Sequence, residues 1–450
     1  MSKASRKKGR EGMKKLLGTK LLNVLLVGTL LAGTLVGCGT AKSNQPASGD
    51  QKEQVTLHFS SWRTEDIDAF KKLNDEFHQQ YPNITVSYEP VKNTEYDSVL
   101  NTSLQTGKGP DLFYLRPFDL GANINKAGYL YPIDKTNVPN LENMNATQTS
   151  IYQTKEGTIY ALPYIYVAYG FIYNQEIFEQ NNIQPAKTWD DFFKALDTLK
   201  TKGITPLALG YKDPWVLNEV VNWGNYGNFI DGENGRKDLL SGKAKLTDPG
   251  YLNFLTTLQK MNKYTPDNAE AISYADSQAI FLGGKAAIFP AGSWEIGSFK
   301  AQNPNVKLGF FPSPVMKAGD KQWEGFNGGA GIGINAKSAH TKEALTYVNW
   351  LASKEVQIET GNLMAGLFPC ASISADSITD PVAKSWLEAG GKQGENFAIG
   401  WGLIGFNSSE PSSSTLASDN LPLMMMNKQT PQQTAEKMQK GLDQWFKPQK

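Results

Sequence analysis

The chain has 450 residues, with 45 basic and 44 acidic side chains and only two cysteines. Hydrophobic residues make up 40% of it, which excludes a wholly disordered chain, and two cysteines exclude a disulfide-rich scaffold. A formal net charge of +1 lacks the basic excess of nucleic-acid-binding proteins, so we expect no nucleic-acid partner.

The first 54 residues have the features of a targeting segment. Residues 1–20 carry eight basic side chains, and residues 21–37 follow as an uncharged, mostly apolar run, which together predict a signal peptide over 1–37. Leu35-Val36-Gly37-Cys38 resembles the lipobox of bacterial lipoproteins. This resemblance implies cleavage before Cys38, acylation of its thiol (palmitate) and an anchor on the extracellular face of a Gram-positive-type cell membrane. Residues 38–54 lack aromatic and large aliphatic side chains, so they predict a flexible tether.

Removal of residues 1–37 changes the charge of the protein. It leaves 37 basic and 43 acidic side chains, a net charge of −6, so the mature chain is acidic. The remaining cysteine, Cys370, then has no partner for an internal disulfide, and we expect it to be a buried apolar residue.

From Val55 onward, segments whose apolar residues have the spacing of a strand are followed in turn by segments with the spacing of a helix. The predicted elements are a strand at 55–59, a helix from about 65, a strand at 84–88, a helix at 94–105 and a strand at 112–115. This β-α-β-α-β order predicts a parallel sheet covered by helices.

The second half of the chain repeats this character. Strands are predicted at 171–173, 206–210, 286–289, 307–310 and 328–334, and helices at about 188–199, 342–351 and from 431. Thr188 and Thr430 each start a capping-box pattern. We therefore expect an α/β protein with two lobes.

Signatures of common enzyme chemistry are missing. The mature chain has three histidines and no HExxH motif, GxSxG motif or complete P-loop, and residues 331–336 fit GxGxxA only within a strand pattern. We expect no metal, no cofactor and no catalytic residues. A pair of carboxylates could still serve a glycoside hydrolase or lyase, so an extracellular enzyme of that kind stays an alternative.

Several short segments, in a fixed order, carry a family resemblance. They are Gly109-Pro110-Asp111-Leu112, residues 160–164, residues 172–174 with Phe178, residues 185–189, residues 284–294 and residues 328–335. On these segments the chain resembles the family 1 extracellular solute-binding proteins, the carbohydrate-binding lipoproteins of ABC importers. The resemblance extends from about residue 55 to the C-terminus.

This resemblance implies a two-lobed, periplasmic-binding-protein-like type II fold with hinge crossovers. Crossovers are expected near 167–171, 324–329 and 364–371, with lobe 1 at 55–167 plus 328–366 and lobe 2 at 168–326 plus 370–450. A monomeric protein would capture an oligosaccharide between the lobes and deliver it to an ABC permease, with no chemistry of its own. A binding protein for another solute, such as a peptide or a phosphorylated compound, stays an alternative.

Candidate ligand-binding residues follow from the chemistry of sugars. Sugar C–H faces pack on aromatic rings, while hydroxyl groups need planar donors and acceptors. In α/β sheets, ligands bind beyond the carboxyl ends of the strands, where several such side chains follow predicted strands or crossovers. The candidates are Trp62, Arg63, Arg116, Asp119, Tyr164, Tyr169, Asp213, Trp215, Trp223, Trp294, Asn327, Gly328, Gly329 and Trp401.

The reasons differ among these candidates. Trp294 is chosen because the family places a stacking aromatic residue at this tryptophan. An alternative role for Arg63 is an ion pair with Glu65 or Asp66, and Trp189, Trp350 and Trp445 are expected in the core. Asp111 precedes its strand, so its expected role is structural.

Overall fold

A computed structural model describes residues 53–390, 396–402 and 405–448. The signal peptide, Cys38 and almost all of the tether lie outside the described residues. Within the described ranges, none of the helices combines the length and the apolar character needed to cross a membrane.

The first strands form the predicted parallel sheet. β1 (Val55–Ser61) pairs in parallel with both β2 (Ile84–Pro90) and β3 (Leu112–Leu115). α1 (Ile67–Gln80) and α2 (Asn93–Gln105) connect these strands. The β-α-β-α-β prediction is therefore confirmed: alternating apolar residues correctly located β1 and β2, and a short continuous apolar run located β3.

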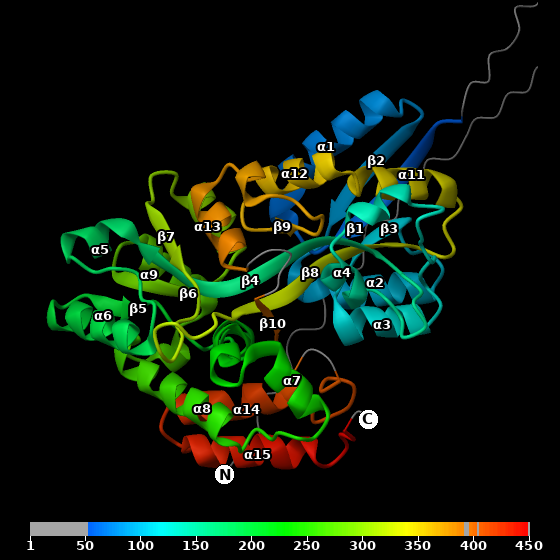
Figure 1. Cartoon of the computed structure of the whole chain (residues 1–450). Helices are drawn as coiled ribbons and strands as arrows, with labels where there is room; N and C mark the ends of the chain where they lie inside the picture. The colour runs from blue at the N-terminus through cyan, green and yellow to red at the C-terminus, as the bar shows by residue number, and fades with distance from the viewer. Residues whose placement is uncertain (1–52, 391–395, 403–404, 449–450) are drawn as a thin grey trace, which may run out of the picture. The chain divides into compact units, whose positions relative to one another are not determined.

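Two long strands join this sheet to the rest of the molecule. β4 (Leu162–Asn174) and β8 (Glu324–Ile334) run antiparallel side by side, and the strand order is β2-β1-β3-β8-β4-β6-β5 (Figure 1). The first half of β4 pairs with β8 and β9, whereas Tyr169–Asn174 pairs with β6 and β7. One continuous strand thus passes from one lobe into the other.

The second lobe contains β5 (Thr205–Leu207), β6 (Ala286–Gly292) and β7 (Leu308–Phe311). β5 ends three residues earlier than predicted. The physical reason is that, beyond Ala208, whose N–H still donates to Ile288 on β6, the backbone bonds to residues 269–277. Gly210 N–H donates to Ser277 Oγ at 2.9 Å, and Tyr211 N–H donates to the Ala269 carbonyl at 2.9 Å.

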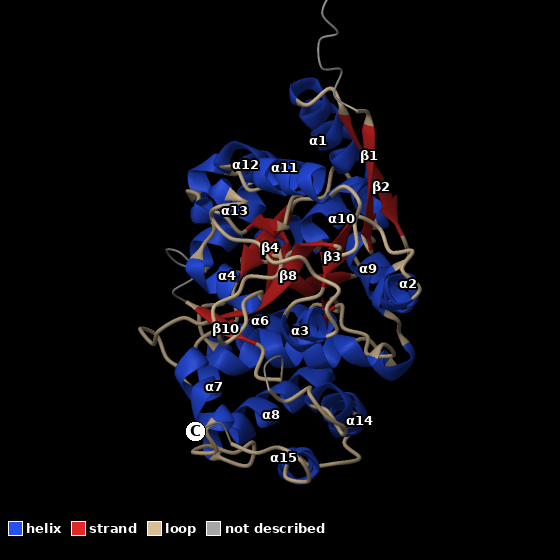
Figure 2. Cartoon of the chain, turned by 90° about the vertical axis from the view of Figure 1, so that its right-hand side faces the viewer, coloured by secondary structure: helices blue, strands red, loops and turns tan. Residues whose placement is uncertain are grey.

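Helices lie on both sides of the strands (Figure 2). α6 (Trp189–Thr201) and α15 (Pro431–Leu442) begin with the predicted capping boxes at Thr188 and Thr430. The other helices are α3 (Phe118–Lys126), α4 (Ala146–Ile151), α5 (Gln175–Gln180), α7 (Gly232–Leu240), α8 (Pro249–Met261), α9 (Tyr274–Leu282), α10 (Glu295–Gln302), α11 (Thr341–Leu351), α12 (Lys354–Leu363), α13 (Pro381–Ala389) and α14 (Ser413–Met425).

Shorter elements complete the described chain. They are the strands β9 (Phe368–Pro369) and β10 (Phe397–Ile399), the π-helix η3 (Val216–Trp223), and the 3₁₀ turns η1 (Thr64–Asp66), η2 (Pro139–Asn143), η4 (Tyr226–Phe229), η5 (Asn262–Tyr264), η6 (Ala269–Ala271) and η7 (Ala375–Ser377).

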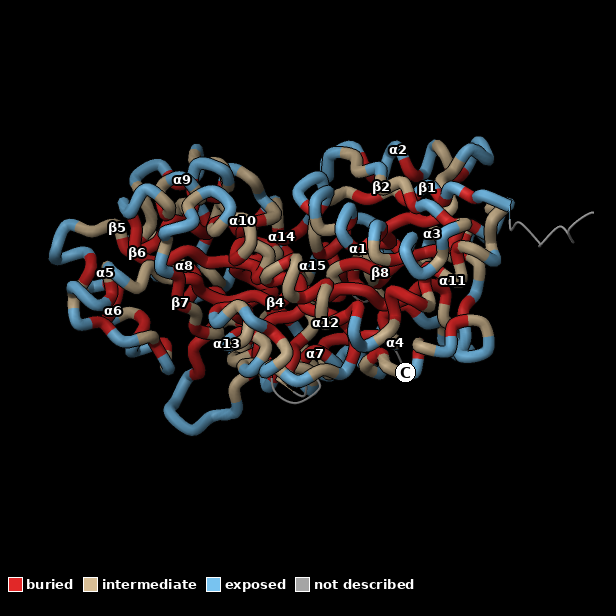
Figure 3. The backbone as a smooth tube through the Cα atoms, turned by 90° about the horizontal axis from the view of Figure 1, so that it is seen from above, coloured by how far each residue is buried: buried red, intermediate tan, exposed pale blue. Residues whose placement is uncertain are grey.

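Buried side chains form two large hydrophobic clusters that meet along β4, which is buried over most of its length (Figure 3). Trp189, Trp350 and Cys370 are buried as predicted. Trp445 differs from its prediction: it lies beyond the end of α15 and is only partly buried, and its Nε1–H donates to the carbonyl of Pro411 at 3.0 Å. The residue boundaries of the two lobes stay a prediction.

Candidate functional site

In the first lobe, Trp62 and Arg116 come together at one edge of the sheet. Trp62 directly follows β1 and Arg116 directly follows β3, and these strands are parallel neighbours. The Arg116 guanidinium carbon lies 4.1 Å from the centre of the Trp62 ring. Arg116 also donates to Asp97 Oδ1 at 3.1 Å and to Asn93 Oδ1 at 2.6 Å. These contacts hold a partly exposed aromatic ring and a planar cation in fixed positions.

Arg63 has a different environment. Its Nε donates to Asp66 Oδ2 at 2.7 Å, and its Nη1 lies 3.0 Å from Glu65 Oε1. The ion pair that the sequence offered as an alternative is therefore present. It commits the Arg63 guanidinium to the start of its own helix.

In the second lobe, four aromatic residues gather in one group, called here the aromatic group: Tyr169, Trp215, Tyr274 and Trp294. The ring centres of Trp215 and Tyr274 are 4.6 Å apart, those of Tyr169 and Trp294 are 5.9 Å apart, and those of Trp215 and Trp294 are 6.4 Å apart. Trp215 and Trp294 are partly exposed, whereas Tyr169 is buried. The group can therefore offer indole surface to a ligand.

Hydrogen bonds hold Tyr274 and Trp294 in position. Tyr274 Oη donates to Glu295 Oε1 at 2.6 Å and accepts from Trp294 Nε1 at 3.2 Å. The backbone N–H of Tyr274 donates to Asp213 Oδ2 at 2.8 Å. Asp213, predicted as a ligand contact, thus has a positioning role through Tyr274. Tyr274 itself is a residue that sequence reasoning missed, because it follows no predicted strand.

The absence of a side chain at Gly292 leaves room for the Trp294 ring. Gly292 ends β6 opposite Tyr169 on β4. A Cβ atom on Gly292 would lie 2.0 Å from Trp294 Cζ3, so the ring rests directly on the backbone. The Gly-Ser-Trp sequence therefore combines a strand end with a close aromatic approach.

At the crossover, Asn327 joins the aromatic group. Asn327 Nδ2 donates to Tyr169 Oη at 3.2 Å, and its buried Oδ1 has no partner among the described residues. Gly328 and Gly329 have packing roles instead of the predicted ligand approach. A Cβ on Gly328 would meet Pro117 at 2.9 Å, and one on Gly329, whose φ is +58°, would meet the carbonyl oxygen of Ile165 at 2.4 Å.

Three candidates lie in the core. Tyr164, Trp223 and Trp401 are at most 2% exposed. The Tyr164 hydroxyl hydrogen-bonds Thr360 Oγ1 at 2.9 Å, and the Trp401 ring packs edge-on against Tyr251. Because protein atoms cover these rings, the arrangement gives no support to their predicted ligand contacts.

Asp119, in the first turn of α3, is half-buried. Burial raises the pKa of its carboxyl group, and hydrogen bonds from the backbone of Gly405 and Asn407 oppose this shift. Its Oδ2 atom has no hydrogen-bond partner within the described chain. Asp119 therefore lies against the segment that follows Trp401, apart from the Trp62–Arg116 pair.

Glu219 is a second residue that sequence reasoning missed. It lies in η3, where every other residue from Val216 to Trp223 is buried, and Glu219 alone is partly exposed. Burial nevertheless raises the pKa of its carboxyl group to about 7, and the positive charge of Arg116 opposes that shift. Glu219 also acts electrostatically on the Tyr169 hydroxyl. A single acid in an otherwise uncharged eight-residue run was the sequence signal that could have revealed it.

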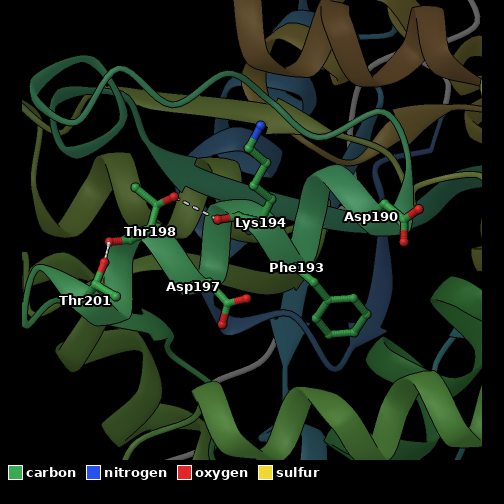
Figure 4. A pocket seen from close by; sticks show the side chains of 6 residues that line it. All are labelled: Asp190, Phe193, Lys194, Asp197, Thr198 and Thr201. Atoms are coloured by element: carbon green, nitrogen blue, oxygen red, sulfur yellow. Dashed lines mark hydrogen bonds between the residues drawn. The ribbon is translucent and has the colours of Figure 1, made fainter.

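A shallow hollow lies elsewhere, on the outer side of α6 (Figure 4). Asp190, Phe193, Lys194, Asp197, Thr198 and Thr201 line it. None of these residues was predicted to bind a ligand. Among the residues that the structure describes, no group of three or more histidine, cysteine or carboxylate side chains could hold a metal ion.

Comparison with known proteins gives consistent matches. Residues 61–358 match the model of the family described as bacterial extracellular solute-binding protein. The multiple sugar-binding protein of Streptococcus mutans is 28% identical over 327 residues, which cover 70% of this chain and 74% of that protein. The melibiose/raffinose/stachyose-binding protein MelE of Bacillus subtilis is 28% identical over 292 residues, covering 63% of this chain and 66% of that protein. Among solved structures, apo RafE from Streptococcus pneumoniae aligns with a TM-score of 0.70 at 22% identity, covering 87% of this chain and 98% of that one.

Proposed function

Because the chain belongs to the bacterial extracellular solute-binding protein family, we propose that its solute is an oligosaccharide, imported through an ABC permease. The two lobes bind the saccharide between the Trp62–Arg116 pair and the aromatic group. The bound sugar stabilises the closed arrangement of the lobes, and the closed protein docks on the permease. A ligand drives this closure only to the extent that it binds the closed state more tightly.

One observation carries the proposal of a carbohydrate. Partly exposed indole rings occur in both lobes: Trp62 in the first, and Trp215 and Trp294 in the second. Arg116 lies over the Trp62 ring, and Trp294 donates a hydrogen bond to Tyr274. Asp213 accepts a hydrogen bond from the backbone of Tyr274, the ring that packs against Trp215. Fixed aromatic surfaces beside planar hydrogen-bonding groups suit the alternating C–H and hydroxyl surfaces of a sugar. The similarity to a multiple sugar-binding protein and to a melibiose/raffinose/stachyose-binding protein supports the same class of ligand.

Isothermal titration calorimetry across neutral mono-, di- and trisaccharides tests this function. We expect one-to-one binding of at least one oligosaccharide. Failure of every saccharide to bind at millimolar concentration would reject the carbohydrate assignment, and binding of a peptide or phosphorylated compound instead would identify another solute.

The alternative of a glycoside hydrolase or lyase has a direct test. Incubation of the protein with its bound saccharide, followed by product analysis, should return the saccharide intact. Accumulation of shorter products over many turnovers would replace the transport function with an enzymatic one.

Trp294 is the side chain on which the site depends most. Trp294→Ala should weaken saccharide binding while the protein still unfolds cooperatively, and Trp350→Ala serves as a tryptophan deletion in the core outside the site. Unchanged affinity in folded Trp294→Ala protein would remove this residue from the site.

The anchor and the oligomeric state form part of the same proposal. Acylation of Cys38 would hold the protein at the extracellular face of the membrane, and the folded part would act as a monomer. Cys38→Ser should release the protein from the membrane fraction into the medium, and light scattering of residues 55–450 should give a monomer mass.

A further inference from the structure

We propose that Glu219 determines the charge class of the ligand, so that the site accepts saccharides that donate hydroxyl hydrogen bonds and rejects saccharides that carry acid groups. This inference rests on the proposed function and narrows its ligand class. The sequence left open whether the ligand is neutral or acidic, and the surroundings of Glu219 favour a neutral one.

Glu219 is directed away from the core on which η3 packs. It is the only residue of Val216–Trp223 that is not buried, and it follows Trp215 of the aromatic group by four residues. Within the described part of the chain, its carboxylate makes no hydrogen bond and no ion pair. Arg116 and Tyr169, on two other elements, are the charged and titratable groups that act on it. Glu219 therefore lies within electrostatic reach of Arg116 from the first-lobe pair and of Tyr169 from the aromatic group, and its acceptor oxygens are uncommitted.

Within the described residues, no free arginine compensates this negative charge. The described chain contains three arginines, and each is ion-paired with a carboxylate: Arg63 with Asp66 and Glu65, Arg116 with Asp97, and Arg236 with Glu233. An anionic sugar would therefore meet the repulsion of Glu219 without an unpaired guanidinium to bind its acid group.

Two further acceptor atoms without a partner in the described chain belong to partly exposed residues. Among partly exposed residues of the described chain, buried side-chain atoms without a partner occur at Asn327 Oδ1 and Asp119 Oδ2. Unpartnered donors, such as Trp223 Nε1, belong to residues that are themselves buried. Glu219 and Asn327 Oδ1, beside Tyr169 of the aromatic group, both offer acceptors, which sugar hydroxyl groups can satisfy and an ionised carboxylate cannot.

The test compares matched neutral and acidic saccharides at pH 8.5, where Glu219 is ionised. The probes are raffinose, maltotriose, xylotriose and N-acetylchitotriose against trigalacturonate and glucuronic-acid-substituted xylotriose. The proteins are the unmodified mature chain, Glu219→Gln, and Glu436→Gln, which makes the same change at an exposed position on α15. Calorimetry gives each Kd, and thermal unfolding confirms that each variant is folded.

We expect the acidic saccharides to bind at least a hundredfold more weakly than the preferred neutral one. Glu219→Gln should weaken binding of that neutral ligand about tenfold, through loss of charge-assisted hydrogen bonds. It should also reduce the ratio of the Kd for acidic saccharides to the Kd for the neutral one. Glu436→Gln should match the unmodified protein.

Two results would overturn the inference while leaving the proposed function intact. One is an acidic saccharide that binds as tightly as its neutral counterpart, and the other is an unchanged affinity of Glu219→Gln for the neutral ligand. If no saccharide binds, either among these six or across the wider panel of neutral mono-, di- and trisaccharides, the proposed function itself fails, and the inference fails with it.

Discussion

The close contact between Gly292 and Trp294 allows a sharp test of the site. Gly292→Ala adds one methyl group at the buried end of β6, 2.0 Å from Trp294 Cζ3. Since ordinary contacts begin near 3.4 Å, the indole ring would have to withdraw by about 1.4 Å. That movement would also strain the hydrogen bond from Trp294 Nε1 to Tyr274 Oη.

The expected effect has two components. Overpacking of a buried position costs about 1–3 kcal/mol of unfolding free energy. Displacement of an aromatic residue that carries binding energy costs about 2 kcal/mol of affinity, which is about thirtyfold in Kd. The second component is specific to a site that includes Trp294.

Gly309→Ala is the matched control. Gly309 lies on β7 of the same lobe, and a Cβ there would meet an aromatic ring in the same way, at 2.1 Å from Tyr173 Cζ. Both variants should therefore lose similar stability in urea or thermal unfolding. Only Gly292→Ala should lose affinity for the saccharide in calorimetry.

Two outcomes would contradict this reasoning. Equal losses of affinity in both variants would mean that binding responds to general destabilisation of the lobe. Unchanged affinity in Gly292→Ala, at a measurably lower unfolding free energy, would mean that the position of the Trp294 ring is irrelevant to the ligand.

Three other predictions concern single side chains. Tyr274→Phe removes the donor to the buried Glu295 carboxyl group and should lower the unfolding free energy by about 1–3 kcal/mol in chemical denaturation; an unchanged value would show that water replaces the bond. Burial raises the pKa of Glu324 well above its ordinary value, so the folded state binds the proton more tightly and stability falls as pH rises above that ordinary value. Melting temperatures from pH 5 to 8 should therefore fall less for Glu324→Gln than for the unmodified protein, and parallel curves would contradict this. Arg116→Lys loses the planar stack on Trp62 and should weaken saccharide binding several-fold in calorimetry, and an unchanged Kd would limit Arg116 to a structural role.

Local sequence patterns predicted most of the strands and many of the helices correctly. Alternating apolar residues located β1 and β2, and Thr188 and Thr430 marked helix starts, because these signals depend on neighbouring residues only. The end of β5 was missed, since the backbone after Ala208 bonds to residues 269–277 and not to β6, as Gly210 does with Ser277, 67 residues away.

The candidate site was predicted less completely, for a similar reason. Position after a strand singled out Trp62 and Arg116 separately, and the structure brings them into contact because parallel strands end at a common edge. The same rule gave no means of distinguishing partly exposed Trp215 from Trp223, which is buried eight residues later. Burial depends on what packs over a side chain, and the sequence alone does not show this.

The sequence by itself determined the family, the α/β character and the side chains available for binding a sugar. Tertiary structure decided which of these side chains remain accessible and what charge they encounter. Glu219 illustrates the difference: its identity is plain in the sequence, but its raised pKa and its electrostatic interactions with Arg116 and Tyr169 arise only when β3, β4 and η3 come together. The physical reason is that solvation and electrostatic interactions act through space, over groups that are far apart along the chain.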